Sequence, residues 1–276
     1  GPRFMSFNGY QNASTMLTSN DGASWSASSP NAGGYTVTMP KNISFIPESG
    51  VFVITARKKN TYTSNSGGNS SWVIGTDLAG SSSSNASCYH RLGQVVPADS
   101  GGNTRRIIAN AGRESRYNDD NGRNGGSGIT WNAGNSNWID GYAGNWGYGK
   151  TTATTHEWLA LRYISANTST EMFKGDGSSM TSFIPSSAPT SAGSNDFDQG
   201  LIFNEVTETW YYNASGTLWE SADFGDNWNT ASIPSDWNSS SQVGAGTFNP
   251  SNGEQVHMNW QHTPSTTRVF RSSGPT

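Results

Sequence analysis

The chain has 276 residues, of which 32% are hydrophobic and 13% charged, and its 20 acidic and 16 basic side chains give a net charge of −4. This negative balance argues against a nucleic-acid partner, because phosphate backbones are bound by clustered lysine and arginine. We also expect no membrane insertion, since no apolar run approaches the roughly 20 residues that span a bilayer.

The composition favours a turn-rich β protein. The 33 glycines stand among many Asn, Ser and Thr residues, while 11 Trp, 10 Tyr and 11 Phe need an interior to pack against. Disordered chains seldom carry so many aromatic side chains. The single cysteine excludes an intrachain disulfide.

The first predicted elements are two strands, residues 4–9 and 15–18, followed by a turn that contains Ser19, Asp21 and Trp25. In such a turn an Asp carboxylate can accept hydrogen bonds from backbone N–H groups two residues on. A Trp that re-enters the sheet can then cover the turn with its ring. We interpret this pattern as a structural device that closes a hairpin and carries no chemistry of its own.

The second and third repeats show weaker forms of the same turn. β-rich segments between residues 42 and 63 precede a glycine-rich turn that ends at Trp72, and the third repeat enlarges the turn to residues 115–131. Asp119 and Asp120 in that turn offer hard oxygens of the kind that bind calcium. Because the residue order of an EF-hand loop is missing, we expect no metal.

The segment between the third and fourth repeats is the best candidate for ligand binding. It places aromatic rings and one acid among glycines and asparagines: Trp138, Asp140, Tyr142, Trp146 and Tyr148. Flat rings on a glycine-rich loop can stack on sugar faces, while Asn and Asp side chains can bond hydroxyl groups. The alternative is that these rings cover the edges of sheets.

The last three repeats include the complete form of the turn. The fourth turn has Asp176 and then Met180, which stands where the other turns have Trp. The fifth turn is complete, with Ser221, Asp223, Gly225 and Trp228. Gly supplies the positive φ that a tight turn needs. The pattern of residues 243–271 again predicts strands, which form a sixth repeat.

The spacing of the five turns indicates a repeat architecture. Their last residues are separated by 47, 59, 49 and 48 positions: Trp25, Trp72, Trp131, Met180 and Trp228. Among repeats of about 40 to 50 residues, the four-stranded propeller blade fits this period best.

The order Ser-x-Asp-x-Gly-x-x-Trp at residues 221–228 resembles the Asp box of sialidase-type (BNR-repeat) β-propellers. The resemblance implies an all-β, six-bladed β-propeller with four-stranded antiparallel blades, in which each Asp-box turn joins the third and outermost strands. One strand of the first blade and one of the last blade are then unaccounted for. We expect a single domain over residues 1–276, processed or cut from a longer chain because it begins Gly-Pro without Met.

The same resemblance raises the question of sialidase chemistry, in which three arginines hold the substrate carboxylate, a Glu-activated Tyr is the nucleophile and an Asp is the acid. Arg57 and Arg162 close apolar strands and could point into a central channel, although they can equally be exposed. On one unbroken strand, Glu205 could share a face with Tyr211, or Glu208 with Tyr212. The family's Arg-Ile-Pro motif near the start is absent, so catalytic residues stay unassigned.

We therefore expect a non-catalytic extracellular or virion-surface propeller that binds glycans or a partner subunit, and no cofactor. Two alternatives are open: a sialidase-like or other glycoside hydrolase, and a structural subunit of a filament, tail or appendage. Ten acids and no Lys or Arg occupy residues 175–267, whereas six arginines lie within residues 91–123. Such opposite charges could favour self-association.

Overall fold

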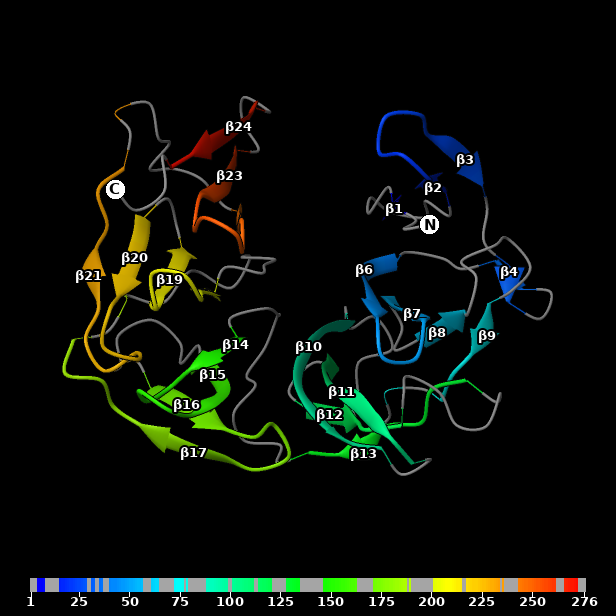
Figure 1. The fold of residues 1–276 in the computed structure, drawn as a ribbon, viewed down its shortest axis with the longest axis horizontal. Helices are drawn as coiled ribbons and strands as arrows, with labels where there is room; N and C mark the ends of the chain where they lie inside the picture. Colours follow the sequence, from blue (N-terminus) through cyan, green and yellow to red (C-terminus); the bar gives the residue numbers. More distant parts are fainter. Residues whose placement is uncertain are drawn as a thin grey trace. The chain divides into compact units, whose positions relative to one another are not determined.

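The computed structural model (Figure 1) shows only β structure in the part of the chain that it describes. The described residues are 4–7, 15–28, 31–32, 35–36, 40–56, 61–64, 72–76, 78, 88–98, 101–111, 114–120, 128–134, 146–162, 171–187, 189, 201–214, 217–233, 235, 243–261 and 266–272. Within these ranges, no helix has the length and apolar character needed to cross a membrane.

The chain divides into two compact units, Gly1–Gly134 and Asn135–Thr276. The first unit contains one three-stranded sheet, two four-stranded sheets and a two-stranded ribbon. Its strands are β1 (Phe4–Phe7), β2 (Met16–Ser19), β3 (Ser26–Ser28), β4 (Asn31–Ala32), β5 (Tyr35–Thr36), β6 (Pro40–Ile46), β7 (Val51–Ala56), β8 (Thr61–Ser64), β9 (Val73–Ile74), β10 (Cys88–Pro97), β11 (Asn103–Ala111), β12 (Glu114–Asn118) and β13 (Asn132–Ala133).

The second unit contains two four-stranded sheets and one three-stranded sheet. Its strands are β14 (Trp146–Lys150), β15 (His156–Arg162), β16 (Glu171–Gly175), β17 (Met180–Phe183), β18 (Leu201–Asn204), β19 (Thr209–Ala214), β20 (Thr217–Ser221), β21 (Asn229–Thr230), β22 (Val243–Phe248), β23 (Gln255–Gln261) and β24 (Thr266–Arg271).

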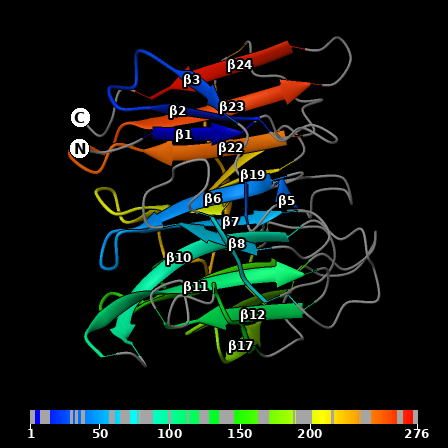
Figure 2. The same cartoon turned by 90° about the vertical axis from the view of Figure 1, so that its right-hand side faces the viewer.

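All of these sheets are antiparallel meanders in which each strand pairs with the next strand of the chain. Figure 2 shows β10, β11 and β12 side by side in this arrangement. Among the described residues there are six sheets of three or four strands, and the first and the last are the three-stranded ones, as the repeat spacing predicts. The predicted fold class, an all-β propeller of six antiparallel blades, is confirmed.

Stacking of neighbouring sheets explains why the middle strands are buried throughout. All six residues of β7 and all four of β8 are buried. Phe52 and Ile54 pack with Met16 of the first sheet, whereas Val53 packs on the opposite side with Ile107 of the third sheet. Because successive side chains of a strand point to opposite faces, a strand between two sheets has no face left for water.

In the second unit, β14 approaches β18 through its glycines. A Cβ atom on Gly147 would lie 2.6 Å from the carbonyl oxygen of Leu201, and one on Gly149 would overlap Phe203. The order of these contacts shows that β14 and β18 run parallel. Beside them lies the core that joins the two sheets: Leu159, Leu161, Met172, Leu201, Phe203, Trp210, Tyr212 and Trp228.

Because successive strands run in opposite directions, the connections of these sheets lie alternately at two opposite edges. Connections 151–155 and 176–179 of the β14–β17 sheet lie at one edge. Since β14 and β18 are parallel, connections 205–208 and 222–228 of the next sheet lie at the same edge. We call this edge the turn edge, and the opposite one, where β14 begins and β15 ends, the loop edge.

An extended segment that follows the outer strand of one sheet pairs with the turn of the next sheet. The Thr76 N–H donates to the carbonyl of Ile129 (2.8 Å), and the Ser186 N–H donates to the carbonyl of Asp226 (2.9 Å). Both acceptors lie two residues before the Trp that ends a predicted turn. The two contacts are therefore equivalent, in agreement with the repeat register read from the Trp spacing.

The two complete turns provide a matched stability test. Trp228 is 2% exposed and Trp25 is 43% exposed. Trp228→Ala should lower the free energy of unfolding by roughly 3–5 kcal/mol, because it leaves a cavity between sheets. Trp25→Ala should cost about 1 kcal/mol, since its ring is half in water. Urea unfolding of both variants measures the difference, and equal losses would contradict it.

Candidate functional site

The fifth turn is closed by a set of short hydrogen bonds. The Ser221 hydroxyl donates to Asp223 Oδ1 (2.8 Å) and accepts from the Gly225 N–H (2.9 Å). Asp223 Oδ1 also accepts from the Asn227 N–H (2.9 Å), and the Trp228 indole donates to the Gly225 carbonyl (2.9 Å). Gly225 has a φ of 93°, a conformation that side chains disfavour.

The same bonds keep the Asp223 carboxyl ionised. Partial burial is the largest single influence on its pKa and raises it, but the hydrogen bonds from Asn227 and Ser221 together outweigh burial, so the pKa is lowered. A carboxylate held in this way is an acceptor for the turn rather than a proton donor for a substrate.

The first turn repeats this pattern of bonds. The Ser19 hydroxyl donates to Asp21 Oδ1 (2.9 Å) and accepts from the Gly22 N–H (2.7 Å), and the Trp25 indole donates to the Gly22 carbonyl (3.0 Å). The backbone N–H of Ser24 (2.8 Å), followed by that of the preceding residue and by the Ser19 hydroxyl, lowers the pKa of Asp21 to about 2.

The fourth turn keeps the carboxylate, a glycine of positive φ at Gly177 and a serine hydroxyl bond from Ser178, but it has no indole. Asp176 Oδ1 accepts from the N–H groups of Ser178 (2.9 Å) and Ser179 (2.8 Å). Met180, 6% exposed, occupies the place of the indole and offers no N–H. This turn therefore depends on one acceptor and on packing.

The third turn uses Asn118 in place of the carboxylate. Its amide donates to the Thr130 carbonyl (2.8 Å), and its Oδ1 accepts from the Asp120 N–H (3.1 Å). Asp119, which the sequence offered as a calcium ligand, instead accepts from the Arg106 guanidinium at 2.7 Å. Over the described ranges, no group of His, Cys, Asp or Glu side chains is arranged to hold a metal ion.

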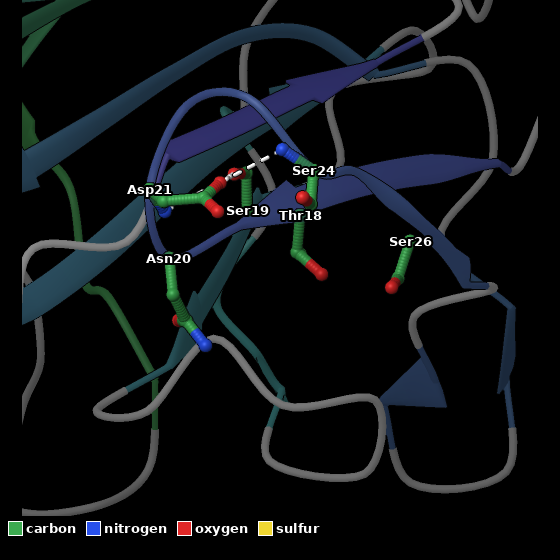
Figure 3. Close-up of a pocket in the computed structure, with 6 residues that line it drawn as sticks. All are labelled: Thr18, Ser19, Asn20, Asp21, Ser24 and Ser26. Carbon is green, nitrogen blue, oxygen red and sulfur yellow. Dashed lines mark hydrogen bonds between the residues drawn. The ribbon is translucent and has the colours of Figure 1, made fainter.

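A polar hollow of about 290 Å³ lies beside the first turn (Figure 3). It is lined by Thr18, Ser19, Asn20, Asp21, Ser24 and Ser26. Figure 3 shows Thr18, Asn20 and Ser26 extending to the same side, while the Asp21 carboxylate turns toward Ser19 and Ser24. The hollow presents hydroxyl and amide groups that can hydrogen-bond a polar ligand.

The predicted ligand segment is described only in its last part. Trp146 and Tyr148 belong to β14, and each ring lies 5.4 Å from the ring of Trp158. Trp146 is 2% exposed, so protein occupies both of its faces, whereas Tyr148 is half-buried. Three predicted ligand residues lie outside the described residues: Trp138, Asp140 and Tyr142.

Of the two arginines considered for a central channel, only Arg162 belongs to the described residues, and Arg57 lies outside them. Arg162 is the last residue of β15, at the loop edge, where its backbone pairs with that of Glu171.

Ion pairs join the first hairpins of two neighbouring sheets at the turn edge. Lys150 pairs with Glu208, and His156 Nε2 lies 3.1 Å from Glu205 Oε2. The Trp210 indole adds a bond to the Lys150 carbonyl (2.6 Å). Since both carboxylates are exposed, each pair contributes at most about 1 kcal/mol. Glu205 and Glu208 lie in the connection between β18 and β19, so neither shares an unbroken strand with Tyr211 or Tyr212, and the predicted strand face is wrong.

Two histidines are buried, and no sequence pattern had marked them. His90 Nδ1 lies 2.9 Å from the Thr55 hydroxyl, and His257 Nε2 lies 2.9 Å from Gln255 Oε1. Burial lowers the pKa of His90 to about 3 and that of His257 to about 4. Both side chains are therefore neutral at pH 7, and their roles are in packing.

Solved structures similar to this chain include three glycoside hydrolases. An ancestral GH74 enzyme gives a TM-score of 0.54 at 14% identity, over 86% of this chain and 30% of that chain. The GH74 xyloglucanase of Xanthomonas campestris gives 0.54 at 12% identity, over 99% of this chain and 43% of that chain. The GH93 α-L-arabinofuranosidase of Fusarium graminearum gives 0.55 at 9% identity, over 94% and 84%.

At these identities the likeness shows a shared fold alone. The chain spans less than half the length of the two GH74 proteins. No family model matches the sequence, and no curated protein matches it. Function has to be argued from the residues of this chain.

The two buried histidines predict a loss of stability in mild acid. Each is protonated near pH 6.5 when unfolded but resists protonation when folded, so stability is full above pH 6.5 and falls as the pH drops toward the folded pKa values. Between pH 7.5 and 5, each histidine should remove about 2 kcal/mol from the free energy of unfolding.

Chemical unfolding of the wild type, His90→Gln, His257→Gln and the double variant at both pH values measures this effect. On acidification, the free energy of unfolding of each single variant should fall by about 2 kcal/mol less than that of the wild type. For the double variant the difference from the wild type should be about twice as large. Variants with the same acid dependence as the wild type would contradict the assignment.

Proposed function

We propose that this chain is a non-catalytic carbohydrate-binding β-propeller whose ligand contacts the loop edge through the segment that enters β14. One observation carries the proposal. Two rings that the sequence offers to a ligand, Trp138 and Tyr142, precede a strand whose glycines pack against β18 and whose rings contact Trp158 of the paired strand β15.

A contact segment that continues into a fixed strand loses less conformational entropy when its ligand binds. A loop that must be ordered when its ligand binds loses part of the interaction free energy to that ordering. Trp146 holds the C-terminal end of the segment in the packed sheet, which lowers the ordering cost of binding through that segment. The arrangement thus separates an anchor, Trp146, from contact residues, Trp138 and Tyr142.

The chemistry of the segment favours an uncharged glycan. Its rings can stack on the apolar faces of sugars, and its asparagines can bond hydroxyl groups. Asp140 is the only charged residue between residues 132 and 149. A lone carboxylate repels acidic sugars, so neutral polysaccharides are the preferred class.

One further observation supports a glycan as the ligand, and a second argues against hydrolysis. The propellers of similar fold include a xyloglucanase and an α-L-arabinofuranosidase, so a propeller of this fold can bind glycans. In the described part of this chain, Glu205, Glu208 and Asp119 are paired with basic side chains, whereas hydrolysis needs two carboxyl groups about 5–10 Å apart across one bond.

The turn geometry supports assigning the chain to the Asp-box type of propeller. Ser19 with Asp21 and Ser221 with Asp223 make the same bonds at the same spacing, each between the last two strands of a sheet. The low content of charged residues and the abundant Asn and Ser suit an extracellular or virion-surface protein, which is the location that we propose.

A glycan array with titrated hits tests the binding function. Wild type should bind neutral polysaccharide fragments, and Trp138→Ala or Tyr142→Ala should weaken binding about tenfold or more, as expected when a central aromatic contact is lost. Trp138→Phe, which keeps a stacking ring, should retain most of the affinity. The control is Phe45→Ala, which removes an exposed ring of the first unit.

Absence of glycan binding by the wild type, or equal binding by wild type and Trp138→Ala, would refute the proposal. Incubation of each bound glycan with the protein, followed by assay of new reducing ends, tests the non-catalytic part. Release of sugar would favour a glycoside hydrolase instead.

A further inference from the structure

The turns of the third and fifth sheets are each covered by an extended segment of the preceding sheet. In the fifth turn, the Ser186 N–H donates to the Asp226 carbonyl (2.9 Å), and the Trp228 N–H donates to the Ser187 carbonyl (3.1 Å) and hydroxyl (2.9 Å). Ser187 and Asn227 form a parallel bridge. This pairing covers Trp228, which is 2% exposed.

The third turn has the equivalent cover. The N–H and the hydroxyl of Thr76 both donate to the carbonyl of Ile129, at 2.8 and 3.2 Å. Thr76 is equivalent in register to Ser186, and its hydroxyl donates to the same carbonyl as its N–H. At the fifth turn the hydroxyl belongs to the next residue, Ser187, and accepts from the Trp228 N–H. The covering segments share a chemistry: extended backbone, small neighbours and a hydroxyl group at the turn.

The first turn has the internal bonds of the fifth turn but, within the described residues, lacks its cover. The groups equivalent to those used at Asp226 and Trp228 are the carbonyl of Ala23 and the N–H of Trp25. Within the described residues, no partner occupies either of them. Residues 20–25 are all exposed, and Trp25 keeps 43% of its surface in water, against 2% for Trp228.

The polar hollow adds a second observation at the same place. It runs along the turn and the strands that flank it, and it contains the hydroxyls of Thr18, Ser24 and Ser26 and the amide of Asn20 (Figure 3). Backbone and hydroxyl groups of an extended peptide can bond all of these. The negative charge of Asp21 disfavours an acidic peptide.

We infer that the first turn is a docking site for an extended segment of a partner polypeptide, which pairs in parallel with Ala23–Trp25 and places a Ser or Thr hydroxyl beside Trp25. The partner's N–H donates to the Ala23 carbonyl, and its next carbonyl and hydroxyl accept from the Trp25 N–H. Recognition is by strand addition, in which backbone bonds give affinity and one side chain gives selectivity. This site uses none of the residues assigned to glycan binding.

The segment that covers the fifth turn supplies the probe. A synthetic peptide of residues 183–189, FIPSSAP, contains both Ser186 and Ser187. Titrated to millimolar concentration, it should shift the indole ¹⁵N–H signal of Trp25 in a saturable way. The signal is identified by its loss in Trp25→Phe.

Two matched peptides distinguish strand pairing from nonspecific binding. N-methylation at the position of Ser186 removes the donor for the Ala23 carbonyl and should weaken binding about tenfold, and the Ser187→Ala peptide should weaken it severalfold. On the protein side, Trp25→Ala should lose most of the peptide affinity, while Val206→Ala, an exposed residue in a different turn, should keep it.

The inference fails if the peptide leaves the Trp25 signal unchanged at millimolar concentration, or if the N-methylated peptide binds equally well. A Trp25 shift that grows with protein concentration alone, without peptide, would replace the partner polypeptide by a second copy of this chain. Loss of glycan binding leaves these outcomes unaffected, because the peptide readout is at Trp25.

Discussion

Face-to-face stacking of neighbouring sheets is the constraint from which the rest of the structure follows. A middle strand such as β7 has a sheet on each side, so all six of its side chains are buried and none can be polar without a partner. Thr55 meets this requirement by bonding His90 of the next sheet. Where two inner strands come closest, as β14 and β18 do, only glycine fits between them.

The same stacking decides where polar side chains are found. Buried polar groups are used for bonds from one sheet to the next, as with Asn204 and the Gly253 carbonyl (2.9 Å) or Trp210 and the Lys150 carbonyl. Exposed charges gather at the connections, where Lys150 and Glu208 or Arg271 and Glu254 form ion pairs. Direct bonds in the core thus specify which sheets are neighbours, while the surface pairs add little stability.

Local pattern sufficed to predict the repeat and not the contacts between repeats. The order of Ser, Asp, Gly and Trp at residues 221–228 is set by bonds within one hairpin, so it is visible in a short stretch of sequence. The role of Trp146 was not visible in this way. Its ring packs against Trp158 of β15, and that contact depends on how β14 pairs with β15.

The histidines and the covering segments were missed for the same reason. Nothing near His90 in the sequence indicates that its partner is Thr55, 35 residues away. Ser187 reads as part of a polar loop, yet it is bonded to the backbone of Trp228, 41 residues away. Of the predicted ligand residues, the sequence could supply the chemistry of Trp138 and Tyr142 but not a geometry, because a loop between sheets has no local period to place its side chains.

The covering segments also affect the order in which the repeats unfold. In the first unit the β6–β9 sheet supplies the strand that covers the turn of the β10–β13 sheet, and in the second unit the β14–β17 sheet does the same for the β18–β21 sheet. Unfolding of the sheet that supplies the covering segment exposes the turn of the next sheet. The loss of one repeat therefore destabilises the repeat that follows it in the chain. Nearest-neighbour coupling of this kind makes adjacent repeats unfold as a group rather than one at a time.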